Sequence, residues 1–536
     1  MVYLFRGKKK RLLIVGVVCT LYLWSLISPS RWFTHVRYSL HLPGDEKHDI
    51  DGLLARQLIE HRSWLSENRS QLSENRSQLS DNKSQLSENR SQYHQTQVTP
   101  TSLHSDATSF NDPRTGSSRV SDDASLSLVY ENKWVGFPEI AGYNCSEALF
   151  STTQNDRFPK AVARIKNRRF FIDSQNCSDF RKQYGFMRYP QVSEEERAFP
   201  IAFIILFHSN LDQVMFLLRA IYRPHNVYCL SVDVNSGDEL IQAVRSVAGC
   251  LPNVFVAGKL ESVVYAGFTR LLADIDCMQD LLERPEPWKY TINMPGQQFP
   301  LRTNLELVRI LKLLNGSNNI DVSEEVWSSV KNRHLYKHIY LANNVTGKLE
   351  PVRTSERNPR PPHGMNIKKG STYAAFSRAF VQFAVHHPVA QDFLEWNKNV
   401  LSPDEYFWTT LQYTGAVSVP GGVFDKPSRV PYITSLSMWK VGNWTCATRF
   451  VRKICILSPE DLSTVVKQNS LFVNKLHINH HPGALHCLDE WLVNRTFAGS
   501  VLDLSLYKSV SDIKVQASGD TSRRTQVDGL DQDSYF

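Results

Sequence analysis

The sequence lacks several motifs that would place it in a common functional class. It contains no G-x-G-x-x-G and no G-x-x-x-x-G-K-[ST] segment, which argues against NAD enzymes and P-loop NTPases. It has no C-x-x-C pair, so a zinc site is not expected, and none of its 17 histidines is predicted as a metal ligand. The net charge of +8, from 61 Lys+Arg against 53 Asp+Glu, is a small excess that gives no indication of nucleic-acid binding.

The composition is that of a large globular protein. Of the 536 residues, 42% are apolar and 21% are charged, which excludes disorder throughout, a collagen-like chain and a small disulfide-stapled domain. A chain of this length is compatible with one large α/β domain that carries appendages.

A basic segment followed by an apolar run marks the N-terminus. Residues 1–11 include five Lys or Arg and no acid, and residues 12–28 are apolar apart from a few hydroxyl side chains. The run is close to the shortest that spans a membrane, and it leads into Ser28-Pro29-Ser30, a poor signal-peptidase site. We predict a cytosolic tail at 1–11 and a type II signal-anchor at 12–28. A cleaved signal peptide is the alternative.

Sequons and cysteines both support a lumenal location for the rest of the chain. Ten Asn-x-Ser/Thr sequons are potential N-glycosylation sites: Asn68, Asn75, Asn82, Asn89, Asn144, Asn176, Asn315, Asn344, Asn443 and Asn494. Besides Cys19 in the apolar run there are eight cysteines: Cys145, Cys177, Cys229, Cys250, Cys277, Cys446, Cys455 and Cys487. An even number in a secretory protein predicts four disulfides, but the spacing leaves the pairing open.

Residues 29–125 are predicted to form a flexible, glycosylated stem. Within it, residues 65–92 repeat a heptapeptide of the type LSENRSQ four times. Each repeat has a single Leu and its own sequon, which is too polar for a coiled coil; a helical, oligomerising stem is the alternative. The polar segment 501–536 is predicted to be a disordered tail, which leaves 126–500 as the lumenal catalytic domain.

Strands and helices alternate in the first part of this domain. The predicted order of strand, helix, strand, helix and strand covers 199–207, 212–222, 227–232, 239–247 and 254–256. This alternation indicates a mainly parallel α/β sheet. Because ligands bind at the carboxyl ends of parallel strands, Asp233 is a candidate site residue.

Five blocks in this domain resemble the core 2 / I-branching β-1,6-N-acetylglucosaminyltransferase family, glycosyltransferase family 14. They are FPIAFIILFHSNLDQVMFLLRAIYRPHNVYCLSVD (199–233), LESVVYAGFTRLLADIDCMQDLL (260–282), WKYTINMPGQQFPLRTNLELVRILKLL (288–314), SPDEYFWTTLQ (402–412), and VRKICILSPEDL with SLFVNKLHI (451–462 and 470–478). The resemblance implies a GT-A-like, Rossmann-like glycosyltransferase domain with a mixed, mainly parallel sheet. It also implies a Golgi enzyme that transfers GlcNAc from UDP-GlcNAc, with no cofactor and no metal.

The resemblance also implies a disulfide pattern. By position in the family, it pairs Cys145 with Cys487, Cys177 with Cys250, Cys229 with Cys277, and Cys446 with Cys455. All eight lumenal cysteines are then used. The family's additional free cysteine corresponds to Pro295 in this chain.

The catalytic and donor-binding residues follow from the same resemblance. The family's general base is the Glu of its SPDE motif, here Glu405, whereas Asp404 is assigned to capping the helix that begins there. A helix-start acid is the alternative for Glu405 itself. Where fold relatives have Asp-x-Asp, this chain has Asp233-Val-Asn235, with a single carboxylate.

The family replaces the metal with basic side chains, which correspond here to Arg452 and Lys475. Asp233 and Tyr265 match positions that contact the uridine end of the donor. For Tyr265 a core aromatic is the alternative, and for the two cations a solvated surface charge.

The family's acceptor-binding residues match this sequence less closely. Asp321 stands where the family has Glu, and the following basic pair corresponds to Lys331 and Arg333. The family's Trp-x-Tyr acceptor platform aligns with Trp439-Lys-Val441, so Trp439 remains and the Tyr is missing. The loss of a hydrogen-bonding aromatic could cost about 1 to 3 kcal/mol of acceptor binding, or it could indicate another acceptor.

The predicted function is therefore inverting, metal-independent transfer of GlcNAc onto Galβ1-3GalNAc-type O-glycans in the Golgi. The predicted partners are UDP-GlcNAc, glycoprotein O-glycans and the membrane, with a possible homodimer and no nucleic acid. The alternatives are a related transferase with another acceptor or donor, namely I-branching, core 4 or protein xylosyl transfer, and a catalytically inactive glycan-binding protein.

Overall fold

The computed structural model describes residues 145–150, 164–189, 192–323, 333–422, 431–442, 444–499 and 502–507. All of them belong to one compact unit, 118–536. The predicted signal-anchor at 12–28, the stem with its repeats at 65–92, and Lys331 lie outside the described residues. Among the described residues, no helix has the length and apolar character needed to cross a membrane.

A five-stranded sheet forms the centre of the domain, in the order β3-β2-β1-β4-β8. Its strands are β1 (Ile201–Phe207), β2 (Val227–Val232), β3 (Val254–Val256), β4 (Tyr290–Pro295) and β8 (Ala375–Ser377). The first four are parallel to their neighbours, and β8 pairs antiparallel with β4. The structure thus confirms the α/β fold and the mainly parallel sheet.

Strand β1 shows why the sheet lies in the middle of the molecule. All seven of its side chains are buried, because successive residues of a strand point to opposite faces and both faces are covered. Ile201, Phe203 and Ile205 belong to one hydrophobic cluster. Ala202 and Ile204 belong to the other.

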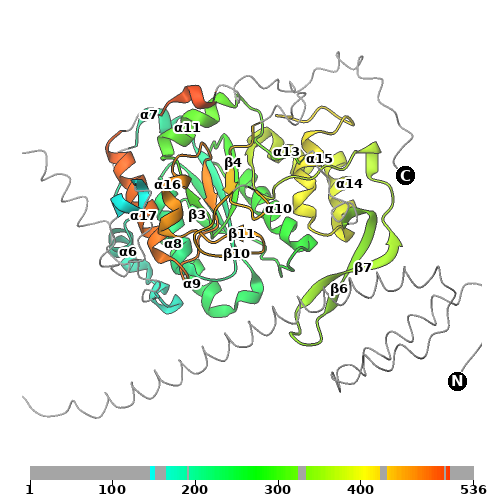
Figure 1. The fold of residues 1–536 in the computed structure, drawn as a ribbon, viewed down its shortest axis with the longest axis horizontal. Coiled ribbons are helices and arrows are strands. Elements are labelled where there is room, and N and C mark those ends of the chain that lie inside the picture. Colours follow the sequence, from blue (N-terminus) through cyan, green and yellow to red (C-terminus); the bar gives the residue numbers. More distant parts are fainter. Residues whose placement is uncertain are drawn as a thin grey trace, which may run out of the picture. The chain divides into compact units, whose positions relative to one another are not determined.

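Different helices supply the two clusters. One is filled by α8 (Leu211–Ile221), α9 (Asp238–Gly249), α11 (Asn304–Leu313) and α17 (Pro482–Phe497). The other is filled by α10 (Phe268–Glu283), α13 (Arg378–His386), α14 (Pro388–Trp396) and α15 (Phe407–Gln412). In Figure 1 the two groups lie on opposite sides of the sheet, which makes three layers. Helices α8 and α9 and strands β1 to β3 are the elements that the sequence pattern predicts.

Smaller elements complete the domain. A three-stranded sheet has the order β5-β12-β9, from β5 (Phe299–Pro300), β12 (Phe472–Asn474) and β9 (Ser435–Ser437). Two hairpins are made by β6 (Tyr336–Ala342) with β7 (Leu349–Arg357), and by β10 (Phe450–Val451) with β11 (Ile454–Cys455). Short helices are α5 (Cys145–Phe150), α6 (Cys177–Gln183), α7 (Glu194–Arg197) and α16 (Leu462–Val465).

Four disulfides tie these layers together. They join Cys145 to Cys487, Cys177 to Cys250, Cys229 to Cys277, and Cys446 to Cys455. These are the pairs that the family resemblance implies. Disulfides of this number are typical of proteins that fold in an oxidising compartment.

The boundary of the predicted C-terminal tail needs a correction. Residues Leu504–Tyr507 form a 3-10 helix, although the tail was expected to begin at 501. The Tyr507 ring is fully buried, and its hydroxyl accepts a hydrogen bond from Arg302 Nε and donates one to the Asn469 carbonyl. This aromatic anchor in a polar segment extends the folded domain to at least residue 507. Residues 508–536 lie outside the described part.

Candidate functional site

Asp233 lies where parallel-sheet proteins bind ligands, just after the carboxyl end of β2. Its side chain accepts hydrogen bonds from the Asn235 backbone N–H, from Asn235 Nδ2 and from the Val263 N–H. The carboxylate therefore caps the 3-10 turn Val234–Ser236 and ties it to the 260–267 loop. It remains partly exposed.

The 260–267 loop presents Tyr265 to Arg452. The Tyr265 side chain is 64% exposed, so it is not a core aromatic. The Arg452 guanidinium carbon lies 3.8 Å from the centroid of its ring, within the range of a cation–π contact. Arg452 has a φ of 52°, in the turn between β10 and β11.

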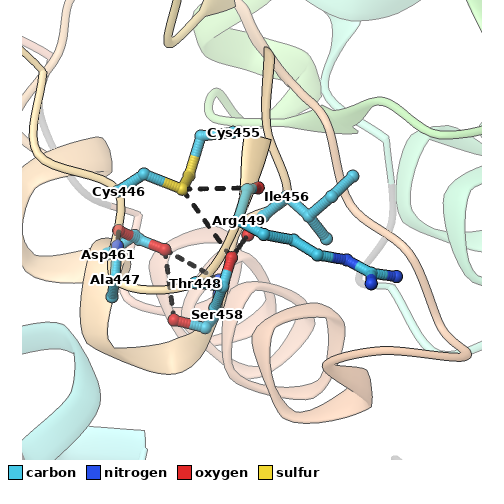
Figure 2. The surroundings of a disulfide bond; sticks show 8 residues. All are labelled: Cys446, Ala447, Thr448, Arg449, Cys455, Ile456, Ser458 and Asp461. Carbon is cyan, nitrogen blue, oxygen red and sulfur yellow. Dashed lines mark hydrogen bonds between the residues drawn. A yellow bond between two sulfur atoms is a disulfide. The ribbon is translucent and has the colours of Figure 1, made fainter. Parts of the chain in front are cut away.

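The hairpin that carries Arg452 is braced at its base. Figure 2 shows the Cys446–Cys455 disulfide beside Asp461, whose carboxylate accepts hydrogen bonds from the Ala447 and Ser458 N–H groups at 3.0 and 2.9 Å. The Thr448 hydroxyl donates to the Ile456 carbonyl. A short hairpin would be too mobile to hold a cation in place without such links.

Lys475 follows β12 and lies on the same side of the domain as Arg452. Its side chain is partly buried, and burial together with the positive charge of Arg452 lowers the pKa of Lys475. Burial and the neighbouring His480 lower the pKa of His477 to about 4, so the imidazole of His477 is neutral near pH 7. Arg452 and Lys475 are therefore placed to attract one anionic group.

Glu405 ends the 3-10 helix Pro403–Glu405, directly before α15. Its side chain is 29% exposed, and Oε2 contacts Arg333 Nη1 at 2.9 Å and Lys369 Nζ at 3.1 Å. Its backbone carbonyl accepts a hydrogen bond from the Gly370 N–H at 2.8 Å. The carboxylate is thus held by two cations at the edge of solvent rather than only placed at a helix start.

A backbone hydrogen bond links the Glu405 helix to the Tyr265 loop. The Ser402 N–H donates to the Ala266 carbonyl at 2.8 Å. Ala266 and Ser402 both have positive φ, 57° and 53°, so both segments turn sharply where they meet. The loop that presents Tyr265 therefore also supports the segment that presents Glu405.

Asp404 does not cap the helix that begins beside it. The N-cap position is Ser402, whereas the Asp404 side chain is buried and accepts a hydrogen bond from the Thr372 hydroxyl at 3.0 Å. Burial raises the pKa of Asp404 to about 6, and the positive charge of Arg270 partly opposes that rise. The prediction of a capping role was wrong, because the Asp404 carboxyl group is buried against Thr372 instead of binding the backbone N–H groups of the helix.

On the other side of Glu405 lies Asp321. Burial raises the pKa of Asp321, and the nearby Lys369 ammonium opposes the rise. Lys369 therefore stands between the two carboxylates. Arg333 is also hydrogen-bonded to the Tyr406 side chain, and burial raises the pKa of the Tyr406 hydroxyl.

Trp439 lies apart from this group of charges. It is 45% exposed and forms an isolated β-bridge with Ile454 of β11. The Lys440 N–H donates to the Lys453 carbonyl, so Trp439 adjoins the turn that carries Arg452. Among the described residues, the predicted site residues thus form one group around Arg452, which Trp439 adjoins, and a second group around Glu405.

Sequence reasoning missed Lys369. It lies in the connection between β7 and β8, outside every block that resembles the family, and no pattern in the sequence marks it. The one local signal is Gly370, because a Cβ there would lie 1.9 Å from the Asp321 carbonyl oxygen and 2.3 Å from Thr409 Oγ1. Only glycine lets this segment approach Asp321 so closely.

One group of side chains in the described residues has the spacing of a metal site, and its chemistry excludes that role. It consists of Cys145, His486 and Glu490. The sulfur of Cys145 is bonded to Cys487, so it cannot act as a thiolate ligand.

Comparisons with known proteins show the family to which the chain belongs. The family model described as "Branch: Core-2/I-Branching enzyme" matches residues 201–466. A bovine protein, beta-1,3-galactosyl-O-glycosyl-glycoprotein beta-1,6-N-acetylglucosaminyltransferase 3, is 37% identical over 342 residues, which cover 61% of this chain and 75% of the relative. Mouse N-acetyllactosaminide beta-1,6-N-acetylglucosaminyl-transferase is 36% identical over 337 residues, covering 62% of this chain and 82% of the relative.

A solved structure, that of a 4-diphosphocytidyl-2C-methyl-D-erythritol synthase from Anaerococcus prevotii, has a TM-score of 0.20 and 12% identity over 39% of this chain and 87% of that chain. That score is too low to carry an argument. The sequence relatives are sufficient, because they match at well over 30% identity across three quarters or more of their own length. The chain belongs to the core-2/I-branching family and is an enzyme of the β-1,6-N-acetylglucosaminyltransferase type.

Proposed function

We propose that this enzyme transfers GlcNAc from UDP-GlcNAc, with inversion, to the 6-hydroxyl of GalNAc in Galβ1-3GalNAc-type O-glycans, which is core 2 branching. The observation that supports the proposal is the environment of Glu405, whose partly exposed carboxylate is held by Arg333 and Lys369. Its segment is also hydrogen-bonded to the loop that carries Tyr265. In this reaction Glu405 takes the proton of the acceptor hydroxyl, and the hydroxyl oxygen bonds to the anomeric carbon of GlcNAc. The bond from that carbon to the diphosphate oxygen breaks, and its electron pair leaves with UDP.

The donor side supplies the charge that the leaving group needs. Arg452 and Lys475 neutralise the diphosphate in place of a metal ion, since fixed cations stabilise the developing negative charge as a metal would. Asp233 and Tyr265 take the uridine end. The stacking of Arg452 on the Tyr265 ring supports this arrangement, because it couples the uridine and diphosphate contacts. We also propose that the donor site is that of a GT-A-like glycosyltransferase domain.

The acceptor side is assigned to Asp321, Lys331, Arg333 and Trp439. The bovine relative is named for a galactosyl-O-glycosyl-glycoprotein acceptor and the mouse relative for N-acetyllactosaminide. The two relatives are 37% and 36% identical to this chain, so sequence identity favours neither acceptor. Core 4, I-type and xylosyl transfer therefore stay as alternative reactions, and an inactive glycan-binding protein is the alternative outside catalysis.

The proposed cellular setting is the Golgi lumen. The four disulfides support folding in the secretory pathway. A single-pass type II anchor at 12–28, a glycosylated stem at 29–125, a catalytic domain from 126 and a tail after residue 507 complete the proposal.

The test is transfer by the full-length protein, purified in detergent, with UDP-GlcNAc, excess EDTA and a panel of aryl glycosides. The panel contains Galβ1-3GalNAc, GlcNAcβ1-3GalNAc and N-acetyllactosamine acceptors, and NMR of the product gives the linkage. We expect transfer to the 6-hydroxyl of GalNAc in Galβ1-3GalNAc despite EDTA. Faster transfer to another panel member would overturn the acceptor, and loss of activity in EDTA would overturn metal independence.

Two variants test the base in the same assay. Glu405→Gln should lower kcat about 10²- to 10⁴-fold, while UDP binding measured by calorimetry stays unchanged. Glu194→Gln, on the exposed surface of α7, is the matched control and should keep full activity. Undiminished transfer by Glu405→Gln would remove Glu405 as the base, and absence of both transfer and UDP binding in the wild type would favour the glycan-binding alternative.

A further inference from the structure

Lys369 contacts the proposed base directly, yet nothing in the family resemblance assigns it a role. Its Nζ lies 3.1 Å from Glu405 Oε2, and 24% of its side chain is exposed, against 29% for Glu405. A fully solvated surface pair contributes little to stability or geometry. This pair differs, because both partners are mostly removed from water and Glu405 is bound by a second cation at the same oxygen.

The backbone around Lys369 is fixed on both sides. The Lys369 carbonyl accepts a hydrogen bond from the Ser323 N–H at 2.7 Å, and the Gly370 N–H donates to the Glu405 carbonyl at 2.8 Å. One side of the segment is thus joined to the strand-like stretch that carries Asp321, and the other is joined to the segment that carries the base. The Cα of Lys369 is therefore held close to Glu405, within reach of the ammonium.

Both cations bind the same oxygen of the carboxylate. Arg333 Nη1 and Lys369 Nζ contact Oε2, and none of the described residues donates a hydrogen bond to Oε1. A glutamate side chain with one oxygen held from two directions has little rotational freedom left. Oε1 is then the oxygen that can receive a proton from a bound hydroxyl.

We propose that Lys369 is a positioning residue for the transfer reaction, which with Arg333 fixes Oε2 of Glu405 and leaves Oε1 to take the acceptor's proton. The inference rests on the proposed role of Glu405. It extends that role, because it names a group that orients the base. A base displaced by 1 Å can lose about 10²-fold in rate.

Lys369 also links the base to the acceptor side. Its charge favours the ionised form of Asp321, against the burial that raises the pKa of Asp321. Asp404 and Tyr406 are other titratable groups near the base. Arg270 and Asp274 are charged groups that act on Asp404. Loss of Lys369 therefore changes the charge near both carboxylates, whereas the Arg452–Lys475 pair keeps its contacts.

The experiment compares Lys369→Met with Lys368→Met in the full-length enzyme. Lys368 is the matched control, because it is the preceding residue on the same segment and its Nζ lies over the Tyr413 ring, 5.9 Å from the centroid. Steady-state rates are measured from pH 5 to 8 with UDP-GlcNAc and the best acceptor of the panel. Melting temperatures show whether each variant is folded.

We expect kcat of Lys369→Met to fall about 10- to 100-fold and the KM for UDP-GlcNAc to stay within about twofold. Lys369→Arg should restore most of the rate, since Arg keeps the charge that holds Oε2 of Glu405. Lys368→Met should leave both kcat and the donor KM unchanged.

Three results would overturn the inference. The first is a Lys369→Met enzyme with wild-type kcat. The second is a loss of rate that Lys369→Arg does not restore, or an equal loss in Lys368→Met, which would indicate a structural or general charge effect. The third is an active Glu405→Gln enzyme, because it would show that Glu405 is not the base. This variant therefore distinguishes failure of the proposed function from failure of the proposed role of Lys369.

Discussion

At the scale of single residues, Asp404 is a carboxyl group that the fold keeps from water beside the proposed base. It is paired with the Thr372 hydroxyl and lies near the partly buried Arg270. Arg270 is itself bound by Asp274 at 2.7 Å, so two buried carboxyl groups share one guanidinium. This explains why the charge of Arg270 does not cancel the effect of burial on Asp404.

The raised pKa of Asp404 predicts a pH-dependent stability. The value is 3.8 for an unperturbed Asp and about 6 in the folded protein, so between these values the folded state binds more protons than the unfolded state. Stability therefore falls as pH rises from about 4 to about 6, by up to roughly 3 kcal/mol from this group. Above pH 6 the contribution is constant.

Asp404→Asn removes this titration, and melting temperatures from pH 5 to 7 measure the effect. We expect the variant to gain stability relative to the wild type as pH rises, because Asn still accepts the Thr372 hydrogen bond but does not ionise. Asp238→Asn, an exposed acid on α9, should run parallel to the wild type. A constant difference between Asp404→Asn and the wild type across this range would contradict the shifted pKa.

The sequence identified part of the candidate site at this scale. Glu405, Asp233 and Tyr265 lie in blocks that resemble the family, and the Val263 N–H ties Asp233 to the loop that carries Tyr265. Lys369 and the buried position of Asp404 could not be predicted. Their surroundings depend on the contact between residues 370 and 321. These residues are far apart in the sequence, so no local sequence pattern indicates the contact.

At the scale of elements, the connection before β8 determines how the Glu405 segment is supported. Gly370 packs against the Asp321 carbonyl and the Thr409 hydroxyl of α15, and its N–H holds the Glu405 carbonyl. The β7–β8 connection, the 321–323 stretch and the start of α15 therefore meet at one glycine. A side chain there would push all three apart.

Gly370→Ala should consequently lower both stability and activity. A Cβ 1.9 Å from a backbone oxygen has no flexible neighbour to displace, and overpacking of this kind costs about 1 to 3 kcal/mol or more. We expect a lower melting temperature and at least a tenfold lower kcat. Gly415→Ala, where a Cβ meets nothing within 4 Å, should leave both unchanged; an equally small effect at Gly370 would show that the segment is loosely packed.

The order of the first elements was predictable, and the reason is physical. Strand β1 is buried on both faces, so its apolar run of seven residues is unbroken, and the helical spacing of α8 is read directly from its apolar positions. Strand β8 and the β10–β11 hairpin have only two or three residues in each strand. The β6–β7 hairpin is longer but largely exposed. The hydrophobic pattern in these segments is therefore weak. The packed 3-10 helix at Tyr507 was missed because one buried aromatic in a polar segment has no periodicity.

At the scale of the whole molecule, one disulfide connects the two ends of the folded domain. Cys145 in α5 and Cys487 in α17 are both buried and 342 residues apart in the sequence. The Cys446–Cys455 disulfide, by contrast, closes a separation of 9 residues at the base of the Arg452 hairpin. The two bonds should therefore have different effects on stability and on catalysis.

Removal of each bond separates global stability from local positioning. Chain-entropy estimates give about 2.5 kcal/mol for a loop of nine residues and more than about 5 kcal/mol for one of several hundred, and the nested Cys177–Cys250 and Cys229–Cys277 bonds reduce the larger value. We expect Cys145→Ala/Cys487→Ala to lower the melting temperature at least twice as much as Cys446→Ala/Cys455→Ala. The second variant should instead raise the KM for UDP-GlcNAc several-fold, because it loosens the hairpin that holds Arg452. Melting curves at one scan rate and donor KM values check both, and equal melting temperatures with equal donor KM values would refute this division of roles.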